Sequence, residues 1–448
     1  MLKQYDAETA RQRLLKRARP DEMPIGQSML DSLADIFGEP LTAEQAVSRI
    51  LSDVRSNGDS ALREWTRRLD DLDLRPAPVS ASRIQSALES IPPAQRRALE
   101  VAAARVDKFH RRQPMTSWVT NELGGTLGQI VRPIRRVGLY IPGGTAPLPS
   151  SVLMSAIPAR IAGVGEIAVV TPPSRSLAGS LSPADPVMLA ACAISGVDEV
   201  YLLGGAQAIG ALAFGTETIP RVDKIFGPGN LFVTLAKRQV YGVVGIDGLA
   251  GPTETVVIAD DSANPAWVAA DLLAQAEHDV LASAILLTPS QALIGRVQVE
   301  VARQLEHRRR AEIIAASLGE RGGAVLTRDL EEAVQLANEY APEHLALSVR
   351  DPYRWVEKVD NAGGIFVGEH SFEVLGDYVA GPSHVMPTGG TARFASPLSV
   401  LDFVKIVSLV ALDEGTARAL APTAAAIAEA EGLEAHANAA RLRARQAA

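Results

Sequence analysis

The sequence predicts an α/β fold with two Rossmann-like, incomplete doubly wound lobes and a helical extension at each end. From about residue 128, short runs of β-branched residues end in glycine and are followed by helical stretches, which is typical of βα units in a parallel sheet. These runs fall into two sets along the chain. The length of 448 residues also exceeds what one ordinary core holds, so more than one domain is expected.

Residues 1 to about 110 are predicted to be largely helical. Apolar positions recur at helical spacing in LTAEQAVSRILSDVRSNGDSALREWTRRLD and again, with a Pro-rich break, in ASRIQSALESIPPAQRRALEVAAARVDKFH. We assign residues 1–35 to an N-terminal helical extension. Residues 36–135 are expected to belong to the same lobe as residues 252–395.

The first set of strands predicts a lobe over residues 136–251, and its strands are RRVGLYIPGG, GEIAVVTPP, DEVYLLGG and DKIFGPGN. The second set lies within residues 252–395, and its strands are TETVVIAD, ASAILLTPS, GGAVLTRD and GGIFVGEH. Helices are expected around 266–278 and 290–306. Residues 396–448 are predicted to form an Ala-rich helical tail that ends in RLRAR, where cations complement the negative end of a helix.

The charge balance argues against a nucleic-acid-binding protein. The net charge is −8, and basic and acidic residues are mixed along most of the chain, so no broad basic face is expected. The first residues carry charges of both signs without an apolar h-region, and no apolar run reaches 18 residues. We therefore expect a cytoplasmic protein that does not enter membranes.

Cys192 is the only cysteine, which excludes an intramolecular disulfide and a cysteine-based zinc site. Its neighbours, MLAACAISGV, are apolar and have a helical pattern. We expect a thiol buried in a hydrophobic core.

Three polar residues follow strands of the 136–251 lobe, at the carboxyl edge where open α/β sheets bind ligands. Tyr140 stands just before the turn Pro142-Gly143-Gly144, Gln207 opens a helix after LLGG, and Asn230 follows FGPG. None of these turns is a G-x-G-x-x-G motif, and Gly-rich βα turns are common without a ligand. Together the three residues indicate a nucleotide site, with ordinary packing as the alternative.

Histidines concentrate in the second lobe and the tail, and His344 has the most suggestive neighbours. In APEH, Pro342 restricts the backbone and Glu343 stands beside the imidazole, so one group can act as a base while the other activates water. The alternative is a helix start with Glu343 near the positive end of the helix dipole.

The segment DLLAQAEHD is expected to place Gln275 and His278 on one face of a helix, because they are three residues apart. Asp377 lies in GDY, and Glu431 and His436 lie in EGLEAHANAA on an expected helix. Gln275, His278, Asp377 and His436 would form a nitrogen and oxygen ligand set that suits Zn²⁺ without thiolates. Glutamine is an uncommon zinc ligand, and a solvated surface helix is the alternative for an isolated Q-x-x-H.

The motifs together resemble the histidinol dehydrogenase family, NAD- and zinc-dependent enzymes of the last two steps of histidine biosynthesis. The resemblance extends from FHRRQP at 109 to EGLEAHANAARLR at 443. Its motifs include RVGLYIPGGTAPLPSSVLMSAIPARIAGV, LLGGAQAIGALAFGT, DKIFGPGN, VGIDGLAGPTE, DLLAQAEHD, APEHL, GDYVAGPSHVMPT and ARFASPLSVLDFVK.

The resemblance implies a role for each matching residue. The implied zinc ligands, for one ion per subunit, are Gln275, His278, Asp377 and His436. The implied catalytic pair is Glu343 and His344, and the implied NAD contacts are Tyr140, Gln207 and Asn230. The implied substrate contacts are Thr253, His384 and Glu431, together with His344 and the zinc ligands.

The resemblance also implies two successive oxidations of L-histidinol, through L-histidinal, to L-histidine. It further implies a homodimer in which the tail crosses over, so that Glu431 and His436 complete the site of the neighbouring subunit. Thr253 departs from the family's usual serine, which keeps the hydroxyl and adds a methyl group. The alternatives are a zinc- and NAD-dependent dehydrogenase of this fold that acts on another polar alcohol, and a binding protein without activity. Retention of every polar residue of the implied site argues against the second alternative.

Overall fold

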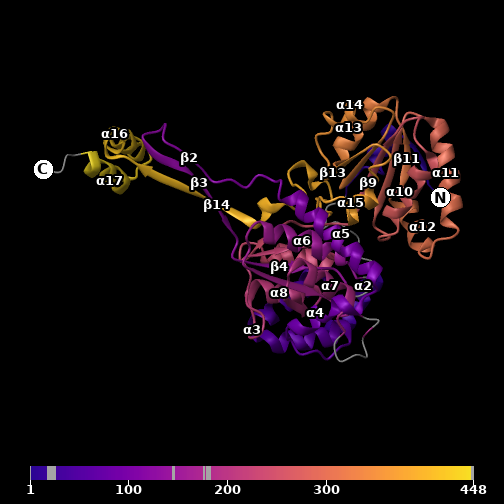
Figure 1. Ribbon diagram of the computed structural model, residues 1–448, viewed down its shortest axis with the longest axis horizontal. Coiled ribbons are helices and arrows are strands. Elements are labelled where there is room, and N and C mark those ends of the chain that lie inside the picture. The colour runs from indigo at the N-terminus through magenta and orange to yellow at the C-terminus, as the bar shows by residue number, and fades with distance from the viewer. Residues whose placement is uncertain (1, 18–26, 144–146, 175–176, 178–182, 445–448) are drawn as a thin grey trace.

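The computed structural model describes residues 2–17, 27–143, 147–174, 177 and 183–444, which form two α/β lobes and a projecting arm (Figure 1). Each lobe contains one parallel sheet, which confirms the predicted fold class. The arm contains a third sheet, which is antiparallel and was not predicted. Within the described residues, no helix is both long enough and apolar enough to cross a membrane.

The first lobe has a five-stranded parallel sheet with the order β6-β5-β4-β7-β8. Its strands are β4 (Arg136–Tyr140), β5 (Glu166–Thr171), β6 (Glu199–Leu202), β7 (Lys224–Phe226) and β8 (Gly245–Ile246). The helices between them are α6 (Pro149–Ile161), α7 (Pro186–Ser195), α8 (Gly205–Phe214) and α9 (Leu231–Val240). Every residue of the central strand β4 is buried, because helices cover both faces of the sheet.

Three earlier helices pack on this same lobe, and they are α3 (Ala43–Asp70), α4 (Ala81–Ser90) and α5 (Pro93–His110). Val47 and Leu62 of α3 share a core with Ile209 and Leu212 of α8, while α4 packs against α7 and α5 against α6. This packing differs from the expected grouping of residues 36–135 with 252–395. The helical period identifies which face of a helix is buried, but not the sheet against which it packs.

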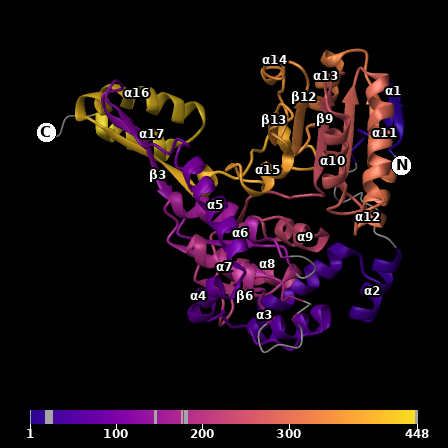
Figure 2. The ribbon, with the colours of Figure 1, turned by 45° about the vertical axis from the view of Figure 1, so that its right-hand side comes forward.

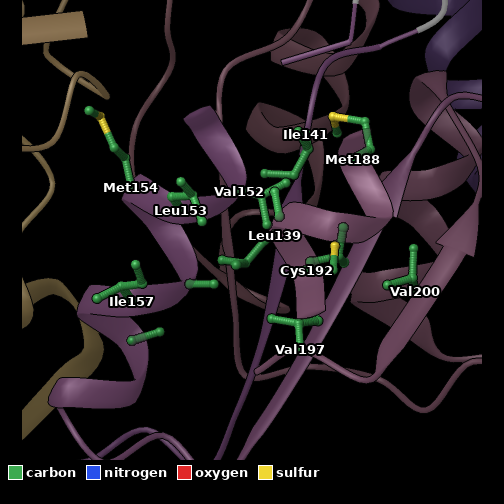
Figure 3. Packing of buried hydrophobic residues seen from close by; sticks show 14 of the residues in the cluster. Leu139, Ile141, Val152, Leu153, Met154, Ile157, Met188, Cys192, Val197 and Val200 are labelled. Carbon is green, nitrogen blue, oxygen red and sulfur yellow. The ribbon is translucent and has the colours of Figure 1, made fainter. Parts of the chain in front are cut away.

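Cys192 lies in the core between the sheet and α7, as predicted. Its side chain is buried with Leu139 of β4 and with Met188 and Val197 around it (Figure 3). Burial raises the pKa of the thiol to about 12, so Cys192 is a packing residue and not a nucleophile.

The second lobe has a six-stranded parallel sheet with the order β1-β11-β10-β9-β12-β13. Its strands are β1 (Gln4–Asp6), β9 (Glu254–Ala259), β10 (Ser283–Thr288), β11 (Gly323–Leu326), β12 (His344–Ser348) and β13 (Gly364–Val367). Its helices are α10 (Pro265–Ala276), α11 (Gln291–Leu305), α12 (Ala311–Glu320), α13 (Leu330–Tyr340), α14 (Tyr353–Val356) and α15 (Glu373–Tyr378). The central strands β9, β10 and β12 are buried along their whole length.

The N-terminal segment was predicted to be helical, and α1 (Ala7–Gln12) and α2 (Gln27–Phe37) agree with that prediction. Residues 4–6 instead form β1, which extends the edge of the six-stranded sheet and pairs Gln4 with Ala324 of β11. Leu2, just before this strand, is buried in the core of the second lobe. A three-residue strand is too short to show a period, and its partner lies far along the chain.

The arm is an antiparallel sheet with the order β14-β3-β2, formed by β2 (Trp118–Thr120), β3 (Gly125–Pro133) and β14 (Val404–Leu412). The short 3-10 helices η3 (Thr391–Arg393) and η4 (Val400–Phe403) precede β14, while α16 (Glu414–Ala430) and α17 (Glu434–Ala444) follow it. The prediction of a wholly helical tail was therefore wrong for residues 404–412. Figures 1 and 2 both show α16 and α17 at the far end of this ribbon, away from both lobes.

Candidate active site

The polar cluster of the second lobe lies at the amino ends of two neighbouring parallel strands. His344 begins β12 and lies opposite Thr255 of β9, so Glu343 lies beside Thr253 and Glu254 at the start of β9. The first backbone groups of a strand can be free of hydrogen bonds to the neighbouring strand. Here the N–H and carbonyl groups of Glu254, at the start of β9, bind the side chains of Glu343 and His344. The pair was predicted either as catalytic or as a helix start, and the structure shows that it begins a strand.

Glu343 is a buried carboxyl group held by two donors. The Thr253 hydroxyl donates to Glu343 Oε2 at 2.5 Å, and the backbone N–H of Glu254 donates to the same oxygen at 3.1 Å. Burial raises the pKa of Glu343 to about 7, although the charge of His344 and both hydrogen bonds act in the opposite direction. Glu343 can therefore exchange a proton near neutral pH, as a general base must.

The environment of His344 determines which ring nitrogen carries the proton. Nδ1 lies 3.2 Å from the carbonyl oxygen of Glu254, and a carbonyl can only accept, so Nδ1 is protonated. In the neutral ring, Nε2 then presents its lone pair. Within the described part of the chain, this buried nitrogen has no hydrogen-bond partner of good geometry, and Asp377 Oδ1 lies 3.5 Å from it.

Two carboxylates from α15 complete the surroundings of this imidazole. Glu373 and Asp377 are four residues apart and thus lie one helical turn apart on α15, and the Thr255 hydroxyl donates to Glu373. Burial would lower the pKa of His344, but Glu373, Glu343 and Asp377 outweigh it and raise that pKa to about 10. Burial raises the pKa of Glu373 to about 7, while the His344 charge holds the pKa of Asp377 below its usual value against burial.

Gln275 and His278 lie at the same site, but not on one helix face as predicted. α10 ends at Ala276, so His278 lies in the following turn, where its N–H donates to the carbonyl oxygen of Gln275. The Gln275 amide is fully buried. Its best orientation places its nitrogen 2.7 Å from Glu373 and its oxygen 2.6 Å from the Glu254 N–H, which donates to it. The Thr253 hydroxyl oxygen lies 2.8 Å away, but its single hydrogen is donated to Glu343.

His384 connects the cluster with the first lobe. Its Nδ1 lies 2.7 Å from the carbonyl oxygen of Asp377, and its Nε2 accepts from the Ser151 hydroxyl at 3.0 Å. Ser151 belongs to α6, which covers the five-stranded sheet. Through His384, the cluster around Glu343 and His344 is therefore in contact with the lobe in which the nucleotide contacts were predicted.

Tyr140, Gln207 and Asn230 lie at one edge of the five-stranded sheet, where β4, β6 and β7 end. Tyr140 is buried and accepts a hydrogen bond from Gly205 N–H at 3.3 Å, and Gln207 is buried on α8. Asn230 caps α9 by accepting from Val233 N–H at 3.1 Å. Gly144 of the predicted turn lies outside the described residues.

Lys237 of α9 binds the backbone of the turn before Asn230. This buried ammonium group donates to the Gly227 carbonyl oxygen at 2.9 Å and pairs with Asp247, which accepts from Gly227 N–H at 2.7 Å. Gly227 has a φ of +111°, and a Cβ there would lie 2.0 Å from the Tyr140 carbonyl oxygen. Only glycine fits, so strand β4 and this turn are in direct backbone contact.

Glu431 and His436 are not part of this cluster within the same chain. Glu431 ends α16 and His436 lies in α17, so they occupy two helices and not the single helix predicted. Both side chains are exposed at the end of the arm. Among the described residues, no group of three or more His, Cys, Asp or Glu side chains has a metal-binding arrangement.

Two residues of the site were absent from the sequence predictions. Glu373 had a signal that could have been used, because it precedes Asp377 by one helical turn in FEVLGD. Glu254 was part of the GPTE motif, but its role depends on backbone groups that side-chain chemistry does not identify.

Comparisons with known proteins agree with the motif resemblance. A family model described as histidinol dehydrogenase matches residues 39–444. The histidinol dehydrogenase of Thermus thermophilus is 53% identical over 402 residues, which cover 90% of this chain and 95% of that protein. That of Deinococcus radiodurans is 51% identical over 420 residues, which cover 93% of this chain and 94% of that protein.

A solved structure has the same fold over the whole chain. The crystal structure of histidinol dehydrogenase from Elizabethkingia anophelis matches with a TM-score of 0.88 and 34% sequence identity. The match covers 99% of this chain and 98% of that one. On these matches, the chain belongs to the histidinol dehydrogenase family of NAD-dependent oxidoreductases.

Proposed function

We propose that this chain oxidises L-histidinol to L-histidine in two NAD-dependent steps, with L-histidinal as the bound intermediate, and that His344 and Glu343 divide the proton transfers. The observation that carries the proposal is the buried Nε2 of His344, which has no good hydrogen-bond partner among the described residues, while the Glu254 carbonyl keeps the proton of the neutral ring on Nδ1. Near neutral pH the neighbouring carboxylates hold the ring protonated; once Nε2 has lost that proton, it can accept the proton of a substrate hydroxyl.

In the first oxidation, His344 Nε2 takes the hydroxyl proton of L-histidinol while hydride leaves the carbinol carbon for NAD⁺. Glu343, in its ionised form, then removes a proton from a water molecule whose oxygen adds to the aldehyde carbon, and protonated His344 returns its proton to the former aldehyde oxygen to give the gem-diol. A second hydride transfer to a fresh NAD⁺, with His344 taking a gem-diol hydroxyl proton, yields the carboxylic acid, which ionises to the carboxylate. The Thr253 hydroxyl supports this role, because its hydrogen bond orients the Glu343 carboxylate.

Gln275, His278 and Asp377 would hold Zn²⁺ together with His436 of a second subunit. The donors fit, since they are nitrogen and oxygen atoms, and His278 is exposed, so a ligand from a second subunit could reach it. Gln275 would exchange its present contacts with Glu254 and Thr253 for the metal. When bound, the ion would supply Lewis-acid positioning of the substrate's amine and imidazole nitrogens.

Tyr140, Gln207 and Asn230 would contact NAD. Their support is their common edge of the five-stranded sheet, since open α/β sheets bind nucleotides at the carboxyl ends of the strands. Thr253, His384 and Glu431 would contact substrate, and the contact between His384 and Ser151 places one of these residues at the junction of the two lobes.

A homodimer with exchanged tails would bring Glu431 and His436 to the neighbouring site. Two observations support it. The tail helices stand apart from the site of their own chain (Figures 1 and 2), and the arm exposes apolar side chains such as Ile406, Val410 and Val119 by more than half. Exposed apolar surface of this kind favours association.

The test is the stoichiometry of NADH formed per L-histidinol consumed. Two NADH per substrate are expected, because the alcohol and the hydrated aldehyde are oxidised at one site. One NADH per substrate would favour an alcohol dehydrogenase of the same fold. If L-histidinol gave no NADH and another polar alcohol did, the chain would be a dehydrogenase of the same fold for that other alcohol.

Metal removal tests the ligand assignment. Dialysis against a chelator is expected to abolish turnover, and added Zn²⁺ is expected to restore it. His278→Ala should lower the bound zinc per subunit, measured by atomic emission, whereas His307→Ala on the same lobe should not. Full activity in metal-free protein would exclude these residues from the chemistry.

A further inference from the structure

Arg17 belongs to the N-terminal segment, ahead of the residues matched by the family model, yet its side chain extends to the start of the catalytic strands. Its guanidinium group pairs with both carboxylate oxygens of Glu254, with Nη2 2.8 Å from Oε2. The pair is largely withdrawn from solvent, at 19% exposure for the Arg17 side chain and 7% for that of Glu254.

The same guanidinium also binds the backbone that leads into the catalytic pair. Nε donates to the Tyr340 carbonyl oxygen at 2.9 Å, and Nη2 donates to the carbonyl oxygens of Tyr340 and Ala341 at 2.7 and 3.2 Å. The group lies 3.8 Å from the centre of the Tyr340 ring. Ala341 has a φ of +52°, a left-handed conformation that a non-glycine residue adopts only when its surroundings hold it there.

Glu254 transmits this anchoring to both catalytic residues. Its backbone N–H donates to Glu343 Oε2, and its carbonyl oxygen accepts from His344 Nδ1. A displacement of Glu254 would thus move both partners of the pair at once. The turn that follows His384 is tied to the same point, because Gly389 N–H donates to Glu254 Oε1 at 3.2 Å.

We propose that Arg17 is a positioning residue for Glu343 and His344, acting through the carboxylate of Glu254 and the carbonyl groups of Tyr340 and Ala341. The inference rests on the proposed function of that pair. A planar guanidinium can bind a carboxylate and two carbonyl groups in one plane, whereas a lysine ammonium group cannot reproduce that fork. N-terminal residues outside the matched family segment thereby contribute to the order of the active site.

The test compares Arg17→Met with Arg11→Met as a matched control. Arg11 lies in the same segment and pairs with Glu339, next to Tyr340, but the pair is far more exposed. Arg17→Met is expected to lower kcat for L-histidinol by roughly one to two orders of magnitude, as a small misplacement of reacting groups does. KM for NAD⁺ should stay within about twofold, because the NAD contacts lie on the other lobe. Arg11→Met should behave as wild type.

Two further variants separate positioning from folding, since Arg17→Met leaves Glu254 buried without its cation. Arg17→Lys keeps the charge, and Arg17→Met/Glu254→Gln removes both charges. Both variants should fold, and in both the kcat per folded molecule should be as low as in Arg17→Met. Millimolar guanidinium chloride should restore part of the kcat of Arg17→Ala, and sodium chloride should not. A wild-type kcat per folded molecule in Arg17→Met or Arg17→Lys would overturn the proposal.

Hydrogen–deuterium exchange gives a readout that needs no substrate. Arg17→Met should speed amide exchange in residues 252–257 and 340–346, while Arg11→Met should leave both segments unchanged. Unchanged exchange in both segments of Arg17→Met would overturn the proposal, even if wild-type protein failed to oxidise L-histidinol. Failure of the wild type alone would instead overturn the proposed function.

Discussion

Three carboxylates surround the imidazole of His344, with Glu343 and Glu373 at 3.7 and 4.0 Å from Nδ1 and Asp377 at 3.5 Å from Nε2. All four groups are withdrawn from bulk water to some degree, so their charges interact more strongly than they would on the surface. Because the four groups lie so close together, the charge of each one shifts the pKa values of the others. Such a cluster stabilises the fold little, and it places two carboxyl groups with pKa values of about 7, those of Glu343 and Glu373, beside the imidazole.

At the scale of single residues, Asp271 offers a test away from the reacting groups. Burial, helped by the charge of Glu369, raises the pKa of this α10 carboxyl group to about 6. Between the unfolded pKa of about 3.9 and that value, the folded protein binds the extra proton, so stability falls as pH rises through this window. Above pH 6 Asp271 is ionised in the folded protein, and the full cost of burying its charge lowers the free energy of unfolding.

Asp271→Asn should therefore unfold at higher urea concentration than wild type at pH 8, with a gain of at most about 3 kcal/mol. The gain should vanish toward pH 4. Glu277→Gln, an exposed carboxylate at the end of the same helix, should show little change at either pH. A gain that is equal at pH 4 and pH 8 would refute the assignment of a raised pKa to Asp271.

At the scale of elements, Asn230 caps α9 and is also a residue proposed to contact NAD. Asn230 caps the helix, and its Oδ1 accepts from Val233 N–H. Asn230→Ala should destabilise the protein by about 1 kcal/mol through loss of the cap, whereas Asn230→Asp keeps the cap. KM for NAD⁺ should rise in both variants, and more in Asn230→Asp, because a carboxylate repels the cofactor's phosphates. Thermal unfolding and initial rates separate the two effects, and an unchanged KM in Asn230→Ala would remove the cofactor contact.

Sequence patterns predicted the elements well where each carries its own local signal. The β-branched runs correctly identified β4 to β7, β9 to β11 and β13, because each alternation of strand and helix shows in consecutive residues. Strand β12 was missed, because its start was predicted as a catalytic pair or a helix start. Strand β14 was mistaken for part of a helical tail, although VKIVSLVAL is rich in β-branched residues. β1 and the packing of α3 to α5 depend on partners distant in sequence, which no local pattern reveals.

The candidate site was predictable only as far as side-chain chemistry extends. Glu343, His344 and Asp377 were chosen as carboxylate and imidazole groups, and the structure brings them together. The position of His278 was predicted wrongly, because α10 ends at Ala276 and His278 therefore does not share a helix face with Gln275. Arg17 and Glu254 could not be found, because they are distant in sequence and their links to Tyr340, Ala341 and Glu343 run through backbone carbonyl and amide groups.

At the scale of the whole molecule, the proposed homodimer makes the arm the element that would complete the site of the neighbouring chain. If tails are exchanged, a His344→Ala subunit and a His436→Ala subunit should regain activity when mixed. One site of such a heterodimer then combines an intact His344 with an intact His436. About half of the wild-type sites per heterodimer are expected to work. The measurement is kcat of tagged, purified heterodimers, with each variant homodimer as the control, and no regain would argue for self-contained chains.

The position of β1 has a consequence for biosynthesis. A ribosome releases the chain N-terminus first, yet Gln4 pairs with Ala324, so the first strand has no place in a sheet until most of the chain has emerged. The five-stranded lobe is built from residues 43–246 and can fold earlier. The first strand and Arg17 behind it are therefore placed late, and a chain that ends before residue 323 would contain the first strand without the strand that pairs with it.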